Sequence, residues 1–521
     1  MKGRLAFAVF ALAAGSCATM PAPPAPADIS RAAATISAED LVARIGVLSS
    51  DDFEGRAPGT HGEEVTLQYL VSEFRALGLS PGNPDGTYVQ KVPLSEFLAT
   101  PTAVVHTPQG RDIAWKQPDD FVAFSYERKP RVHIENSPLV FVGYGVVAPE
   151  YQWDDYKGMD LRGKTLAVLV NDPQIPDPAD PAKLDESMFK GKAMTYYGRW
   201  TYKYETGVKL GAAGVIIIHE TKPAAYPYEV VANSWGRENF EIRSSTPSEE
   251  YPPVAGWMKL ETAKELLAAT GHDLEKLRQS ALRRDFRPVT LGTTITFDIA
   301  NTWREVDSYN VVARIEGSDP KLRGETVVHT AHWDHFGWDP RLPGTKSGQV
   351  YHGAIDNASG VASLLALARA YRSLPRAPSR SILFICTTGE ERGLLGARYY
   401  VKNPLYPLER TPGEINIDGV NAFGRTKDIT ILGMGRSTLD DMGGGVEYIG
   451  KPAGYADEVR DMFTAERYHK VQDTLRADYD FSGAVEDLQI LFRLGNELAE
   501  TRQYPQWKPG SEFSRPDPTR P

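Results

Sequence analysis

Apolar and polar positions alternate in blocks along the second half of the chain, and the blocks predict strands and helices in turn. Short apolar runs are typical of buried strands, and longer amphipathic stretches are typical of helices. Strands that alternate with helices favour a parallel sheet with helices on its faces. We therefore predict an α/β fold with a mainly parallel sheet covered by helices. The predicted strands are 310–315, 326–330, 381–387, 414–417 and 428–432, and the helices between them are 359–371 and 392–400.

The first half of the chain has two other sequence patterns. Helical spacing of apolar residues over 37–79 predicts two helices, the second at about 61–77. From about 139 to 300, short β-like runs are separated by long loops rich in Pro, Asp and Tyr. Since 521 residues are too many for one ordinary core, this change predicts an inserted β-rich domain. The predicted parts are residues 37–133 and 301–495 for the main domain, 134–300 for the inserted domain and 496–521 for a tail.

Polar residues suited to binding metal follow several of the predicted strands. His332, Asp418 and the pair Glu390 and Glu391 each come just after an apolar strand run. Because ligands bind beyond the carboxyl ends of the strands in such sheets, the fold would deliver all four side chains to one edge. Asp356 lies in a Gly-rich loop just before a helix, where the backbone can bend tightly around an ion.

These residue types predict a zinc site at that edge. Zinc accepts imidazole nitrogen and carboxylate oxygen, and a catalytic site keeps one position open for water. Two zinc ions about 3.5–4 Å apart need a ligand that bridges them, and the two oxygens of a carboxylate such as Asp356 can do so. Together with His469, farther along the chain, these residues predict a hydrolase with two metal ions.

Five segments carry a resemblance to a known family. They resemble the signatures of the di-zinc aminopeptidase and glutamate carboxypeptidase II family, and the resemblance covers about residues 38–490. In that family the inserted domain is a protease-associated domain, to which 140–147 and 207–217 are similar; the stretch 48–60 is also family-like. The five segments are His332-x-Asp334, Gly353-Ala354-x-Asp356-Asn357-Ala358-Ser359-Gly360, Glu390-Glu391-x-Gly393-Leu394-Leu395-Gly396, Asn416-x-Asp418 and Tyr468-His469-x-x-x-Asp473-Thr474.

The resemblance implies two zinc ions and a ligand set for each. His332 and Asp418 would complete one zinc site. Glu391 and His469 would complete the other, and Asp356 would be shared between them.

The resemblance also implies three residues that act beside the metals. Asp334 would hold a ligand imidazole, or the turn around it, in the metal-binding orientation. Glu390 would take the proton of the attacking water and pass it to the leaving amine. Tyr468 would donate a hydrogen bond to the tetrahedral oxyanion.

The expected function is that of a zinc-dependent exopeptidase acting on peptides, most simply an aminopeptidase. A carboxypeptidase or dipeptidase of the glutamate carboxypeptidase type stays open, because the metal centre does not reveal whether a free amine or a free carboxylate is recognised. A non-catalytic binding relative is disfavoured by the retained ligands and Glu390. A glutaminyl cyclase with one zinc is disfavoured by the complete two-metal set.

The N-terminus has the pattern of an export signal. Met1-Lys2-Gly3-Arg4 is followed by an apolar run too short to span a bilayer. The run ends in Ala14-Gly15-Ser16-Cys17, which resembles the lipobox of bacterial lipoproteins, with plain cleavage nearby as the alternative. We predict a signal peptide at 1–17, a lipid on Cys17 and a Pro/Ala-rich tether at 18–36. The protein would be exported, as a periplasmic or outer-membrane lipoprotein or in secreted form.

Composition and net charge limit the classes of binding partner that we expect. The formal net charge of -10 gives no electrostatic reason to expect nucleic acid, and a membrane would be reached only through the lipid anchor on Cys17. The other cysteine, Cys386, lies in an apolar run, which favours a buried strand cysteine over a nucleophile.

Two further groups of residues allow more than one interpretation. For His329, His335 and His352 we favour a supporting or structural role over metal ligation. An aromatic group either lines a substrate cleft or packs inside the inserted domain. Its members are Tyr196, Tyr197, Trp200, Tyr202 and Tyr204.

The interval between Asp418 and His469 is short for the family that the chain resembles. The sequence passes directly from 437–442 to 443–448, as if a block were absent. In the family this block includes a strand of the sheet and part of the specificity pocket. We expect metal binding to persist, and stability and activity to be reduced by an uncovered sheet edge.

Overall fold

The computed structural model describes residues 24–192, 194–244, 248, 250–428, 430–432, 441–443 and 446–507. The predicted signal peptide, Cys17 and the last part of the predicted tail lie outside the described residues. So does most of the junction at which a block was expected to be absent, over 433–440 and 444–445.

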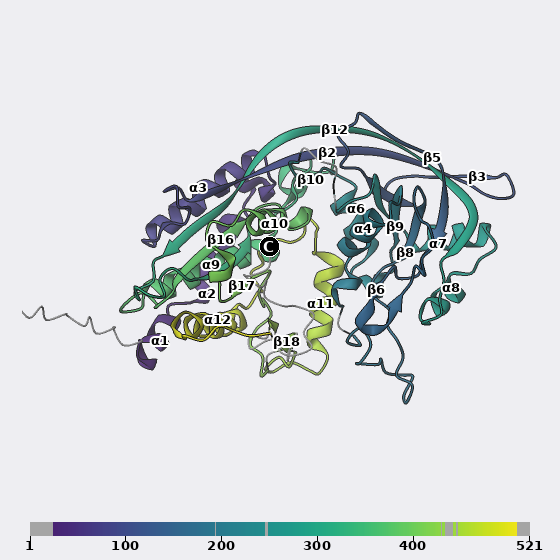
Figure 1. The fold of residues 1–521 in the computed structure, drawn as a ribbon. Helices are drawn as coiled ribbons and strands as arrows, with labels where there is room; N and C mark the ends of the chain where they lie inside the picture. The colour runs from purple at the N-terminus through teal and green to yellow at the C-terminus, as the bar shows by residue number, and fades with distance from the viewer. Residues whose placement is uncertain are drawn as a thin grey trace, which may run out of the picture.

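In the described part of the chain, two lobes share one continuous β-sheet of 13 strands (Figure 1). The long strands β2 (Val89–His106) and β12 (Val289–Ile315) pair antiparallel along their length and run from one lobe into the other. An α/β fold is therefore confirmed, with a large mixed sheet whose parallel strands form a run in each lobe. The main path of the sheet is β17 (Glu414–Asn416), β13 (Thr326–His332), β16 (Ser381–Thr387), β12, β5 (Arg131–Phe141), β8 (Thr165–Leu169), β9 (Gly214–Ile218), β11 (Val254–Met258) and β4 (Phe121–Phe124).

In the first lobe β17, β13 and β16 are parallel, and both faces of this run are covered. Alternate residues of a strand point to opposite faces. Phe384 and Cys386 of β16 accordingly join one hydrophobic cluster, while Leu383 and Ile385 join another beneath Tyr400. Burial on both faces explains why the sequence of β16 reads as a continuous apolar run.

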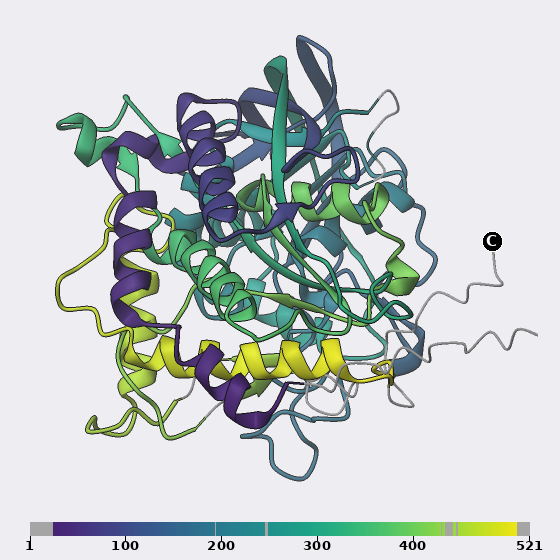
Figure 2. The same ribbon diagram turned by 90° about the vertical axis from the view of Figure 1, so that its left-hand side faces the viewer.

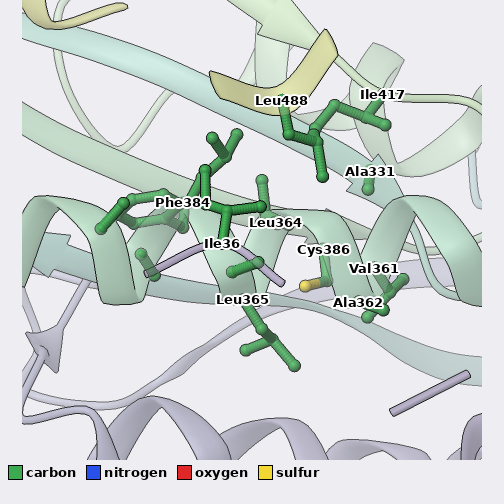
Figure 3. Packing of buried hydrophobic residues seen from close by; sticks show 14 of the residues in the cluster. Ile36, Ala331, Val361, Ala362, Leu364, Leu365, Phe384, Cys386, Ile417 and Leu488 are labelled. Carbon is green, nitrogen blue, oxygen red and sulfur yellow. The ribbon is translucent and has the colours of Figure 1, made fainter. Parts of the chain in front are cut away.

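Helix α9 (Gly360–Arg372) forms the centre of the larger cluster in this lobe. Val361, Leu364 and Leu365 of α9 are fully buried and lie near Phe384 and Cys386 of β16 (Figure 3). Burial raises the pKa of the Cys386 thiol, so this residue is a structural core cysteine, as the sequence predicted. The helices around α9 are α2 (Ala38–Leu48), α3 (His61–Ala76) and α12 (Ser482–Glu500), seen together in Figure 2.

The second lobe has its own hydrophobic core on the parallel strands β5, β8, β9 and β11. This core includes Ala103, Trp115 and Phe121, which precede the predicted domain boundary at residue 134. The chain enters the core of the second lobe before residue 134, because β2 is long enough to leave one core and enter the other. The lobe also contains helices α4 (Trp200–Lys209), α6 (Tyr228–Trp235), α7 (Leu260–Ala269) and α8 (Leu274–Ala281).

The predicted tether at 18–36 is wrong from residue 26 onward. Helix α1 (Pro26–Ala33) begins with a proline in its first turn, where proline is tolerated, and its alanines favour helix. Ala32 and Ala33 are buried in the core of the first lobe, and α1 contacts α12 and α9. Among the residues described, no helix is both long enough and apolar enough to cross a bilayer.

The strand predicted at 428–432 is found over Thr430–Leu432, but its predicted place in the main sheet is wrong. Strand β18 (Thr430–Leu432) pairs antiparallel with β19 (Asp441–Gly443) in a separate two-stranded sheet. Within the described part of the chain, β17 therefore has β13 as its single neighbour and forms the edge of the main sheet.

Replacing the fully buried Leu365 by Ala should lower the free energy of unfolding by about 2–5 kcal/mol, because the change leaves a cavity in a packed core. Val401, which is 59% exposed, is the control, and its replacement by Ala should change stability by less than about 0.5 kcal/mol. Urea denaturation followed by tryptophan fluorescence measures both. Equal effects of the two substitutions would contradict the packing described for α9.

Candidate metal centre

The predicted site residues meet at the carboxyl edge of the three parallel strands. His332 is the last residue of β13, and Asp418 follows β17. Glu390 and Glu391 lie in the short turn after β16, whose end is paired in register with His332. The structure thus brings together from three strands the four side chains that the sequence placed just after apolar runs.

Asp356 lies between the two histidines. Its Oδ1 is 3.3 Å from Nε2 of His332, and its Oδ2 is 3.3 Å from Nε2 of His469. His332 Nε2 also lies 3.2 Å from Asp418 Oδ1, and His469 Nε2 lies 3.1 Å from Glu391 Oε2. Two sets of nitrogen and oxygen donors therefore share one carboxylate.

Asp334 holds the turn that carries both glutamates. Its two carboxylate oxygens accept the backbone N–H groups of Glu390 at 3.0 Å and Glu391 at 3.4 Å. The backbone carbonyl oxygen of Asp334 lies 3.1 Å from Nδ1 of His332. Asp334 thereby contacts the turn through its side chain and a histidine of the site through its backbone.

The loop before Asp356 is fixed by a second carboxylate. Asp473 accepts the backbone N–H groups of Ile355 at 3.1 Å and Asp356 at 2.9 Å. Gly353 has φ of +56°, and a Cβ there would clash with the carbonyl oxygen of Asp356 and the ring of His335. This loop consequently requires glycine at 353 and an acceptor at 473.

Arg56 is a buried support that the sequence analysis did not single out. Its guanidinium donates to the backbone carbonyls of Trp333 at 2.8 Å, Leu48 at 2.6 Å, His352 at 2.7 Å and Gly353 at 2.9 Å. Burial lowers its pKa to about 10, so the group stays charged. Its position in the family-like stretch 48–60 was the one signal available, but the carbonyls of Trp333, His352 and Gly353 that it contacts are distant in sequence.

The electrostatics of the site favour a cation. Burial raises the pKa of Glu390 to about 8. The charge of His332 acts to lower this pKa, and the negative charge of Glu391 acts to raise it. Burial disfavours the charged form of His469, yet Glu391 and Asp356 raise its pKa to about 10. Both shifts reflect an excess of negative charge held away from water.

The neighbouring histidines have contacts of their own. His335 Nδ1 lies 2.5 Å from Glu391 Oε1, so it contacts the carboxylate oxygen of this predicted ligand that does not face His469. His352 Nε2 lies 2.8 Å from Asp51 Oδ1. His329 is buried in the core, with its ring stacked on Phe384.

Tyr468 lies against His469, with the two ring centroids 3.9 Å apart. Burial raises the pKa of Tyr468 well above its ordinary value, and the charge of Asp356 acts in the same direction. The phenol therefore keeps its proton and is available as a hydrogen-bond donor.

A cleft of about 1150 Å³ opens onto this site between the two lobes. Asp356, Glu390 and Asp418 line it from the first lobe, and Tyr196 and Trp200 line it from the second. The predicted aromatic group is thus divided, since Tyr196 and Trp200 line the cleft whereas Tyr202 and Tyr204 are buried in packing.

Helix α6 of the second lobe supplies a contact that no sequence signal indicated. Ser234 Oγ lies 3.0 Å from Nδ1 of His469, 235 positions farther along the chain. A single serine on an amphipathic helix carries no motif, so this pair could not be found without the fold.

Comparison with known proteins places the site in a peptidase-like segment. Residues 310–465 match the model of Peptidase family M28. The match includes His332, Asp356, Glu390, Glu391 and Asp418, and His469 follows it.

Two curated relatives match shorter parts of the chain. A vacuolar membrane protease of Lodderomyces elongisporus is 29% identical over 119 residues, which are 23% of this chain and 11% of that protein. Carboxypeptidase Q of Xenopus laevis is 31% identical over 169 residues, 30% of each chain. The chain therefore spans well under half the length of either relative.

Among solved structures, an aminopeptidase from Aneurinibacillus sp. strain AM-1 is 18% identical with a TM-score of 0.49, covering 94% of this chain and 100% of that one.

Replacing Arg56 by Lys should lower the free energy of unfolding of the metal-free protein by about 1–3 kcal/mol. A lysine has three donors and no planar fork, so a buried carbonyl loses its partner. Arg162, whose side chain is 79% exposed beside Asp160, is the matched control, and R162K should change stability by less than about 0.5 kcal/mol. Thermal unfolding of both variants in chelator checks the difference, and R56K with wild-type stability would contradict the role of Arg56.

Proposed function

We propose that this protein is a zinc-dependent exopeptidase, an aminopeptidase, that hydrolyses the N-terminal peptide bond of peptides with two zinc ions. The single observation that carries the proposal is the Asp356 carboxylate, which has one oxygen facing His332 and the other facing His469. A peptidase is also what the family match over 310–465 indicates.

The donors fit zinc. All are imidazole nitrogens or carboxylate oxygens, and donor atoms of His332, Asp356 and Glu391 lie within 4.8 Å of one another, as do those of His332, Glu390 and Asp418. His332 and Asp418 would hold one ion, Glu391 and His469 the other, and Asp356 both. Bound zinc would supply Lewis acidity toward the scissile carbonyl and lower the pKa of a water molecule.

Glu390 is the proposed general base. It lines the cleft, and the bond from its backbone N–H to Asp334 fixes the turn that presents it. Its carboxylate takes a proton from the attacking water as the C–O bond forms, and passes that proton to the amine as the C–N bond breaks. The Tyr468 hydroxyl donates to the developing oxyanion.

A carboxypeptidase is the second candidate, favoured by the similarity to Carboxypeptidase Q over 169 residues. The metal-binding residues are compatible with either polarity, because they act on the scissile bond and not on the free terminus of the peptide.

The remaining sequence-based expectations belong to the same proposal. The protein would be exported by residues 1–17 and anchored through a lipid on Cys17. The second lobe would be a protease-associated domain that forms one wall of the substrate cleft. These assignments are supported by the sequence patterns at the N-terminus and at 140–147 and 207–217.

The two adjacent glutamates should respond differently to the same substitution. Wild-type protein should hold close to two zinc ions per chain after mild dialysis. E390Q should keep both ions and lose turnover by about 10²–10⁴-fold, since it removes general-base assistance. E391Q should lose zinc. Metal analysis and steady-state kinetics measure both effects. The reverse pattern would show that the roles of the two glutamates are exchanged. One zinc ion or none in the wild type would reject the two-zinc centre.

Blocked peptides distinguish the two polarities. We expect metal-replete protein to cleave a dipeptide with a free amine and a C-terminal amide, and to leave its N-acetylated counterpart with a free carboxylate intact. The opposite result would establish a carboxypeptidase. Cleavage of neither peptide, by protein that holds two zinc ions, would reject the exopeptidase assignment.

A further inference from the structure

The second lobe contributes a side chain to the surroundings of a predicted metal ligand. Ser234, near the end of α6, is buried, with its Oγ 3.0 Å from Nδ1 of His469. We propose that Ser234 is a positioning residue that fixes the imidazole of His469 for zinc, so that one of the two ion sites is completed by the second lobe. This inference rests on the proposed function.

The two ring nitrogens of His469 face different groups. Nε2 faces Asp356 and Glu391, and Nδ1 faces Ser234. A nitrogen that binds metal carries no proton, so binding through Nε2 leaves the proton on Nδ1. That N–H then donates to the Ser234 hydroxyl, which fixes both the tautomer and the ring orientation.

The backbone of His469 needs such support. His469 has φ of +55°, in the left-handed region that residues with a side chain rarely adopt. Its carbonyl oxygen accepts a hydrogen bond from Nδ2 of Asn233, the neighbour of Ser234, at 3.4 Å. Two adjacent residues of α6 thus hold the backbone and the ring of the same histidine.

Helix α6 also contacts the turn that carries the other outer ligand of this ion. Arg392, which follows Glu391, donates from Nη1 to the carbonyl oxygen of Ser234 at 2.5 Å. The helix is itself fixed in the second lobe, where Trp235 stacks on Phe124 with ring centroids 4.9 Å apart. The Glu391 and His469 site is therefore built across the two lobes.

The other ion site has a different surrounding. His332 ends one strand of the first lobe and Asp418 follows another, and the hydrogen bond from His332 Nδ1 goes to the carbonyl oxygen of Asp334 in that same lobe. Loss of Ser234 should therefore weaken one of the two sites and leave the other unchanged.

The test compares S234A with S234T and with S137A. Ser137 is the matched control, since it is a buried serine of the second lobe whose Oγ donates to Gly163 and accepts from Thr165. Zinc affinity is measured for each site by competition with a chelator. The visible absorption of the cobalt(II)-substituted protein reports the geometry of the ligands.

We expect S234A to lose about 10–100-fold in zinc affinity at one site, with an altered cobalt spectrum. S234T keeps the hydroxyl and should bind both ions as the wild type does. S137A should lower the melting temperature and leave both affinities and the spectrum unchanged.

The inference is overturned if S234A binds both ions with wild-type affinity and spectrum, or if S137A shows the same loss, because the effect would then be general destabilisation. If the wild type holds a single zinc ion, the proposed two-zinc function fails. Weaker binding of that ion by S234A would still support the positioning role of Ser234, and unchanged binding would overturn that role. Wild-type protein that binds no zinc overturns both.

Discussion

Negative charge held away from water at one edge of the sheet is the constraint on which the rest of the structure depends. Asp356 and the carboxylate of Glu391 are largely removed from solvent, and Glu390 lies beside them in the cleft wall. An isolated carboxylate out of water costs on the order of several kcal/mol, so such a group is kept only where cations and hydrogen bonds compensate. The imidazoles of His332 and His469 supply part of that compensation, and the remaining excess of negative charge is what makes the edge suitable for metal ions.

The compensating bonds come largely from the backbone, which explains the loop sequences around the site. Asp334 and Asp473 accept N–H groups of the two segments that carry Glu390, Glu391 and Asp356. Arg56 has the opposite role, because its guanidinium donates hydrogen bonds to backbone carbonyl oxygens of neighbouring turns. Donors and acceptors that would be unpaired in these tight turns are thereby satisfied, and the turns cannot move without breaking several bonds together.

Local pattern was sufficient to predict several strands of the first lobe and to place the candidate site residues near the ends of those strands. Strand 381–387 was predicted to the residue, because burial on both faces leaves an uninterrupted apolar run. Of the long strand β12 only 310–315 was predicted, because its pairing with β2 decides its length. The helix at 26–33 was missed because its Pro/Ala-rich sequence was interpreted as an extended tether, although its alanines favour helix. Strand 428–432 exists over a shorter range, but its partner could not be read from its own sequence. The contacts of Ser234 with His469 and of Arg56 with Trp333 join residues more than 200 positions apart, and no spacing rule indicates such pairs.

The continuity of the sheet links the shape of the cleft to the metal centre. Strands β2 and β12 are paired over both lobes, so the second lobe is joined to the first by two long hydrogen-bonded strands. A rotation of the lobes large enough to widen the cleft would have to bend these strands and would also draw α6 away from His469 and Arg392. In the proposed function, substrate binding between the lobes and metal binding at the Glu391 and His469 site would therefore depend on the same relative position of the two lobes. By thermodynamic linkage, whatever stabilises that position in one process favours the other.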